Sequence, residues 1–117
     1  MGINEQSIKS FQHIMSLTSA QKKTLKSVGH ILDPVVQIGD RGLTDGVLGE
    51  LERALNDHEL IKVRIAGAER EARAALIETI LSHTKAELVQ SIGKVALLYR
   101  HNPQANPRLS NVARYTE

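Results

Sequence analysis

The sequence predicts an α+β domain in two layers: a small mixed four-stranded sheet, ordered strand, helix, strand, helix, strand, strand, preceded by an N-terminal helix. Three observations lead to this prediction. Short apolar runs rich in β-branched residues alternate with segments of helical period. A strand-helix-strand unit is expected to place its two strands in parallel through a right-handed crossover. The last two strand-like runs are joined only by Gly93-Lys94, which requires an antiparallel hairpin.

Length and composition narrow the class of protein. The 117 residues suit a single domain with one core. The chain has no cysteine, which excludes disulfides, thiol chemistry and cysteine-ligated zinc and agrees with a reducing compartment. No apolar run approaches the ~18 residues of a membrane span, and the N-terminus lacks the apolar stretch of a signal peptide. We therefore expect a cytoplasmic protein with no membrane partner.

The formal net charge is only +2, but its sign is uneven along the chain. Both ends carry more lysine and arginine than acid, while residues 40–87 carry more acid. If the fold brings the two ends to one surface, a basic patch results. An evenly solvated surface is the alternative.

The first well-defined element is a helix that begins after Thr18. Thr18 and Gln21 form a capping box, and Gly29 suits the C-terminal cap. Leu25 and Val28 lie on one side of this helix, and its lysines lie on the other: Lys22, Lys23 and Lys26. This lysine-bearing side of the helix is a candidate binding surface, although a solvated row of lysines is the common alternative. Residues 1–17 are expected to be a poorly ordered extension or a short helix.

The first strand, from Val35 to Ile38, runs into the loop Gly39-Asp40-Arg41-Gly42. Thr44 then suits the N-cap of a second helix. Two glycines allow positive φ and the close approach of a large partner, and a helix start offers unpaired N–H groups, so the loop suits a phosphate. The alternative is that the turn needs glycine for its geometry alone. The loop lacks the residues of a P-loop or a dinucleotide fingerprint, so nucleotide binding is disfavoured.

The remaining elements follow from periodicity. A helix is expected to about residue 56, a half-buried strand over 60–65, a helix over 69–84, and strands over 87–92 and 95–99. Lys62 and Arg64 alternate with the apolar residues of the strand over 60–65. This polar face could contact a ligand, although a solvated face is the ordinary explanation. Residues 101–117 contain two prolines and few apolar residues, and so predict a flexible basic tail whose removal leaves the melting temperature nearly unchanged.

Catalysis has little support in the sequence. None of the five histidines has the spacing of a metal site or neighbours a plausible nucleophile, so no catalytic residue, metal, cofactor or small-molecule substrate is predicted. Only three aromatic residues occur, Phe11, Tyr99 and Tyr115, so there is no stacking platform for single-stranded nucleic acid. If RNA is bound, we expect backbone and shape to dominate recognition.

Several separated blocks of the sequence resemble one known family. They are Leu17–Lys23, Pro34–Thr44, His58–Val63, Val89–Lys94 and Leu97–Arg100. In this order they resemble stand-alone bacterial CRM-domain proteins of the YhbY type, over about residues 17–100, so residues 18–100 are expected to form the RNA-binding domain. The resemblance implies a fold similar to the C-terminal domain of translation initiation factor three.

The resemblance also implies a function. The family's G-x-x-G RNA-contacting loop falls on Gly39, Asp40, Arg41 and Gly42, and its basic first helix on Lys22, Lys23 and Lys26. The implied partner is ribosomal RNA in large-subunit precursors, whose assembly the protein would assist. Separately from the resemblance, we expect a monomer that is not an enzyme. Lys94 and Arg100 are added as candidates by charge and expected proximity. The alternative is an adaptor that docks on a ribosomal protein or assembly factor.

Overall fold

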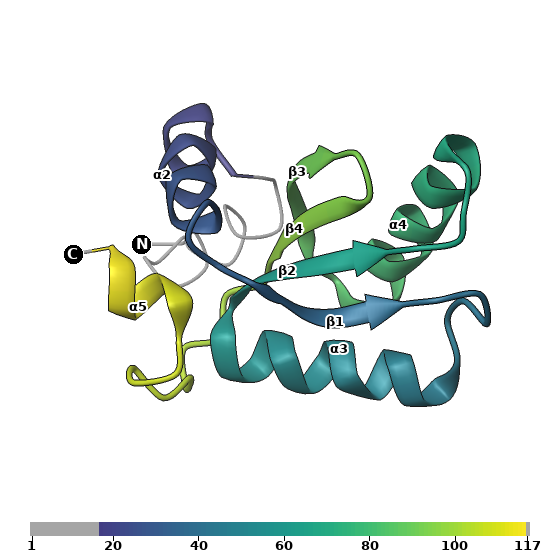
Figure 1. Cartoon of the computed structure of the whole chain (residues 1–117). Coiled ribbons are helices and arrows are strands. Elements are labelled where there is room, and N and C mark those ends of the chain that lie inside the picture. The colour runs from purple at the N-terminus through teal and green to yellow at the C-terminus, as the bar shows by residue number, and fades with distance from the viewer. Residues whose placement is uncertain (1–16, 117) are drawn as a thin grey trace, which may run out of the picture.

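The computed structural model describes residues 17–116 and shows a four-stranded mixed sheet with helices packed on its faces (Figure 1). In chain order the elements are α2 (Ser19–Gly29), β1 (Pro34–Ile38), α3 (Asp45–His58), β2 (Leu60–Ile65), α4 (Arg70–Thr84), β3 (Glu87–Ile92), β4 (Val95–Tyr99) and α5 (Asn111–Tyr115). The predicted α+β class and element order are confirmed, with α5 as an addition. The extension predicted for residues 1–17 lies, except for Leu17, outside the described residues.

The strands lie in the order β1-β2-β4-β3. β1 and β2 are parallel, as expected for a strand-helix-strand unit, and β4 is antiparallel to both β2 and β3. In the β3–β4 hairpin Gly93 has a φ of 57° and Lys94 does not have a positive φ, as in a type II′ turn. β2 is therefore a central strand, and its C-terminal end lies beside the end of β1 and the start of β4.

The main core lies between the sheet and helices α3 and α4. The predicted alternation of β2 is confirmed, since Ile61, Val63 and Ile65 are at most 1% exposed and face this core. The helices contribute further buried side chains, among them Leu51 and Leu55 of α3 and Ile77 and Ile80 of α4. Each such side chain stabilises the fold by about 1.5–3 kcal/mol relative to its exposed state.

α2 covers one end of the opposite face of the sheet. A second apolar cluster lies beneath it and consists of Leu25, Val28, Leu60, Val89 and Leu97. Tyr99 packs at its margin, where burial, with smaller effects of Glu59 and Glu87, raises the pKa of Tyr99 to about 12. The other end of this face, toward the start of β4, is not covered by α2, so the face is only partly enclosed.

α2 begins as predicted but ends differently. The capping box is present: Thr18 N donates to Gln21 Oε1 at 2.8 Å, and Gln21 N donates to Thr18 Oγ1 at 3.1 Å. Gly29 is the last helical residue, and His30 is the C-cap. Gly29 instead allows close packing, because a Cβ at this position would lie 2.5 Å from Leu97 Cδ2. The glycine lets α2 approach β4.

The C-terminal segment corrects the prediction of a flexible tail. Residues 101–116 fold back along the start of β2, and Ser110 and Asn111 are 1% and 8% exposed. Ser110 Oγ donates to Glu59 Oε1, and Asn111 Nδ2 donates to Leu60 O, both at 2.7 Å. Val112 packs against the second apolar cluster. The anchors are mainly polar, so apolar periodicity did not reveal them, and removal of the segment is expected to destabilise the domain.

Glu59, between α3 and β2, holds this segment in place. It is 7% exposed and has a φ of 61°, which is unfavourable for a residue other than glycine. Its Oε2 accepts from Asn102 N at 2.7 Å and lies 3.2 Å from His101 Nδ1, and its backbone oxygen accepts from Arg100 N at 2.8 Å. A buried carboxylate is tolerated here because its oxygens are hydrogen-bonded.

We predict that Asn111→Ala lowers the melting temperature by several degrees, because it removes the buried hydrogen bond to the Leu60 carbonyl, a loss of about 1–2 kcal/mol. Arg108→Ala is the control, since Arg108 is an exposed residue of the same segment. Thermal unfolding followed by circular dichroism measures both variants. Equal melting temperatures for the two variants and the wild type would contradict the docking of this segment.

Candidate nucleic-acid interface

The glycine loop connects β1 to α3 as predicted, and its two glycines differ in conformation. Gly42 N donates to Gly39 O at 3.0 Å and closes a turn with Asp40 and Arg41 exposed at its tip. Gly42 has a φ of 70°, in the region that favours glycine, whereas Gly39 does not have a positive φ. The Thr44 hydroxyl then caps α3, as expected. Only the second glycine is therefore required by backbone geometry.

The glycine loop lies beside the loop that follows β2. Ala66 N donates to Ile38 O at 2.8 Å, which joins the ends of the two parallel strands. A Cβ on Gly67, whose φ is 76°, would collide with the Asp40 carboxylate. Asp40 thus lies against the neighbouring loop, and Arg41 supplies the positive charge at the tip.

The β3–β4 hairpin reaches the same end of the sheet. Ile65 N donates to Lys94 O at 2.7 Å, so the hairpin turn lies beside the end of β2. Three loops therefore meet at this end: residues 39–44, 66–69 and 93–94. The structure brings two of the predicted cations, Arg41 and Lys94, to this end of the sheet, both of them exposed.

The α2 lysines border the part of the sheet that α2 leaves open. His30 lines a hollow in this face, whereas the side of α2 that bears Thr24 faces α5. Lys22 and Lys26 precede His30 by eight and four residues, so the three lie along one ridge of the helix. Lys22 and Lys26 are half-buried, and Lys23 is exposed farther around the helix.

β2 contributes two further cations, Lys62 and Arg64, for which a solvated strand face was the ordinary explanation and which were not among the predicted site residues. Lys62 pairs in register with Leu97 and Arg64 with Val95, so both lie on the partly open face between α2 and the three loops. Arg64 is exposed and Lys62 half-buried. The strict alternation of β2 was the signal that could have identified them, because it places apolar side chains on one face and cations on the other.

None of the cations of this face forms an ion pair within the described chain. The ion pairs found among residues 17–116 join Arg100 to Glu52 and His101 to Glu59, at the opposite end of the sheet. Together these cations form the basic face, which consists of Lys22, Lys26, Arg41, Lys62, Arg64 and Lys94. Like charges that share one surface produce a positive potential, which attracts polyanions.

Arg100, which was also predicted as a binding residue, lies apart from the basic face and is engaged within the fold. Its Nη1 donates to Glu52 Oε1 at 2.9 Å and to Thr84 O at 2.8 Å, and its Nη2 donates to Asn56 Oδ1 at 2.9 Å. The guanidinium thus joins the end of β4 to α3 and α4. The side-chain acceptors lie more than forty residues away in sequence, so charge alone could not reveal this structural role.

Among residues 17–116, no group of three or more histidine, cysteine, aspartate or glutamate side chains could hold a metal ion. Within the same range, no helix has the length and apolar character needed to cross a membrane.

Comparison with known proteins agrees with the resemblance noted in the sequence. Residues 17–100 match the model of the CRS1 / YhbY (CRM) domain. A Pseudomonas aeruginosa protein named probable RNA-binding protein is 57% identical over 101 residues, covering 86% of this chain and 97% of the relative. A Haemophilus influenzae protein named RNA-binding protein is 50% identical over 94 residues, covering 80% and 95%.

A solved structure is similar in fold as well as in sequence. The solution structure of a Staphylococcus aureus protein matches with a TM-score of 0.68 and 34% sequence identity. The match covers 78% of this chain and 95% of the other. The architecture is therefore shared by a relative whose structure was determined independently.

We predict that Gly42→Ala lowers the free energy of unfolding by about 1 kcal/mol, because alanine is strained at positive φ. Gly39→Ala is the matched control, because Gly39 does not have a positive φ and a Cβ added there would meet open space. The stability of this control variant should be nearly unchanged. Urea unfolding measures both variants. Equal losses in the two variants would contradict the turn geometry described here.

Proposed function

Because the chain belongs to the CRS1 / YhbY (CRM) domain family, we propose that it is an RNA-binding protein that uses the basic face. We propose further that its target is ribosomal RNA in large-subunit precursors, and that it assists their assembly in the cytoplasm as a monomer, by binding and not by catalysis. The observation that carries this proposal is a set of cations without an ion pair in the described chain, with Lys62 and Arg64 on the partly open face of the sheet, Arg41 and Lys94 in loops at its end, and Lys22 and Lys26 on α2.

Phosphate contacts are the main contribution expected from such a face. Lysine and arginine side chains that neutralise phosphates release counterions, which makes binding strong at low salt and weak at high salt. Arg41 at the tip of the glycine loop and Lys94 in the hairpin would contact the backbone at one end of the face. Lys22 and Lys26 would contact it at the other end. Contacts of this kind position an RNA without identifying its sequence.

The position of the aromatic residues favours folded RNA over a single strand. Tyr99 packs in the second apolar cluster, and Tyr115 lies on α5 beneath Arg114, whose Cζ is 5.0 Å from the ring centroid. Phe11 lies outside the described residues. The described part of the basic face therefore has no phenyl or phenol ring on which successive bases could stack, so selectivity would come from the shape of a folded RNA.

The named relatives support RNA binding, and the family resemblance supports ribosomal RNA as the target. The Pseudomonas and Haemophilus relatives carry RNA binding in their names. The ribosomal target follows from the resemblance to YhbY-type proteins, which implies a site exposed while the large subunit is being assembled.

A protein-interaction adaptor remains the second candidate function because apolar side chains are also exposed. Ile31 and Ile92 are each 62% exposed, and Val35 is 49% exposed. A protein interface with an apolar core would persist at high salt and would need no RNA, whereas phosphate-driven binding falls steeply as salt rises. Salt titration therefore separates the two functions.

We predict that Arg41→Ala leaves the fold intact but lowers affinity for ribosomal RNA about fivefold and the salt slope by about one charge. The fold should persist because Arg41 is exposed and makes no ion pair within the described chain. Fluorescence anisotropy over a salt series measures affinity and slope together. Arg53→Ala, an exposed arginine on α3, is the control. An unchanged affinity and slope for Arg41→Ala would refute the loop assignment.

We also predict that the wild-type protein sediments with large-subunit precursors at low salt, is depleted from translating ribosomes, and is released as salt rises. The double variant Lys22→Glu and Lys26→Glu should lose this comigration and keep its fold, since neither lysine belongs to an apolar cluster or forms an ion pair within the described chain. Arg53→Glu on α3 is the charge-reversal control. A double variant that stays on the precursor, or a wild type equally abundant on mature ribosomes, would favour the adaptor function.

A further inference from the structure

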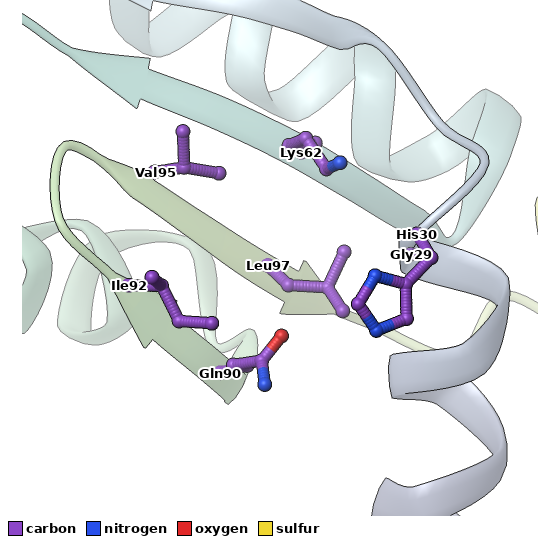
Figure 2. A pocket seen from close by; sticks show the side chains of 7 residues that line it. All are labelled: Gly29, His30, Lys62, Gln90, Ile92, Val95 and Leu97. Carbon is purple, nitrogen blue, oxygen red and sulfur yellow. The ribbon is translucent and has the colours of Figure 1, made fainter.

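A hollow of about 230 Å³ lies in the partly open face of the sheet, where α2 ends (Figure 2). Leu97 and Val95 of β4 lie at its centre. Lys62 of β2 and Gln90 of β3 lie on either side, because both pair in register with Leu97. The imidazole of His30 borders the end nearest α2. Side chains from α2 and three strands therefore surround one concave site.

The two polar side chains at its margins are not used by the fold. Neither Lys62 nor the Gln90 amide makes a side-chain hydrogen bond or ion pair with residues 17–116. An amide offers two donors and an acceptor, and a lysine ammonium offers three donors. Both are half-buried beside an apolar floor, so a ligand in the hollow could be recognised by hydrogen bonds as well as by contact.

The apolar lining is also exposed on this side. Ile92 is 62% exposed and pairs in register with Val95, which is half-buried. The volume of about 230 Å³ has room for a small planar group such as a single base. The hollow is too small for a drug-sized ligand, whose pockets start at about 300 Å³.

We propose that the hollow binds one unpaired base of the RNA, an inference that rests on the proposed RNA-binding function and makes it more specific. The base contacts Leu97, Val95 and Ile92, its edge is hydrogen-bonded by Gln90, and the His30 ring packs against it. Lys62 and Arg64 bind the phosphates on either side of the unpaired nucleotide. Bulges and loops are the places where a folded RNA presents such bases.

Charge favours a nucleotide over a peptide as the occupant. No acidic residue lines the hollow, while Lys62 lines it and Arg64 pairs with the lining residue Val95. Lys26 lies on the same ridge of α2 as His30. A ligand that enters between these cations binds most favourably when negative charges flank a ring on both sides. A nucleotide within an RNA chain has this arrangement, because a phosphate lies on either side of its base.

The test uses the full chain and two fluorescein-labelled RNA hairpins that differ in one nucleotide. One has a fully paired stem and the other carries a single bulged uridine in the same stem. The affinity for each is measured by anisotropy at several salt concentrations. The bulged hairpin is expected to bind about tenfold more tightly than the paired hairpin, and to keep part of this advantage at high salt, because the base adds apolar contacts that salt does not screen.

Ile92→Ala should reduce the affinity for the bulged hairpin about fivefold and leave the affinity for the paired hairpin within about twofold. Ile31→Ala is a matched control, because Ile31 has the same exposed fraction of 62% but does not line the hollow. It should bind both hairpins like the wild type. Both isoleucines are exposed, so neither variant is expected to unfold the domain.

The outcomes distinguish base binding in the hollow from RNA binding by the basic face. Equal binding of the two hairpins, or an equal effect of Ile92→Ala on both, would overturn the base-binding hollow while leaving RNA binding by the basic face intact. Either result would make the apolar lining a candidate contact for a protein partner instead. If neither hairpin nor ribosomal RNA binds, the proposed function itself fails, and the hollow fails with it.

Discussion

The alternation of side chains along β2 is the constraint on which the rest of the structure depends. Ile61, Val63 and Ile65 fill the main core, and the residues between them, Lys62 and Arg64, lie on the opposite face. A shift of one residue in the register would bury two cations and expose three isoleucine or valine side chains, which is strongly unfavourable. The same burial that fixes the sheet therefore fixes the positions of two charges on the basic face.

Strand direction determines which loops share an end of the sheet. β1 and β2 are parallel, so both end beside the helices that follow them, and β4 begins at the same end because it is antiparallel to β2. The glycine loop, the loop around Gly67 and the hairpin at Lys94 meet there for this reason. The opposite end carries Glu59, Arg100 and the C-terminal segment, whose polar side chains are engaged in hydrogen bonds. The two ion pairs found among residues 17–116 thus lie at the end opposite the three loops.

Local signals predicted much of this fold, and long-range contacts account for the rest. The capping box at Thr18, the strand alternation and the hairpin at Gly93 depend on neighbouring residues, so the sequence revealed them. The docking of Asn111 on the Leu60 carbonyl and the bonds of Arg100 to α3 join residues more than forty positions apart. Polar anchors of this kind carry no periodicity. The basic face could be predicted only in part. The alternation of β2 indicates that its cations share one face, but which other elements border that face depends on long-range contacts.

The spacing between the two groups of cations is set by core packing. Gly29 has no room for a side chain beside Leu97, so α2 lies directly against β4, and Leu25 and Val28 hold it in the second apolar cluster. Lys22 and Lys26 are therefore held at a fixed distance from the loops at the other end of the face. A rigid arrangement binds a matching RNA without the entropy cost of ordering loops and disfavours an RNA whose phosphates are spaced differently. Under the proposed function, the close packing of Gly29 on Leu97 therefore contributes to selectivity for a folded RNA, because it fixes the spacing of the cations. Such selectivity does not require aromatic rings that stack on successive bases.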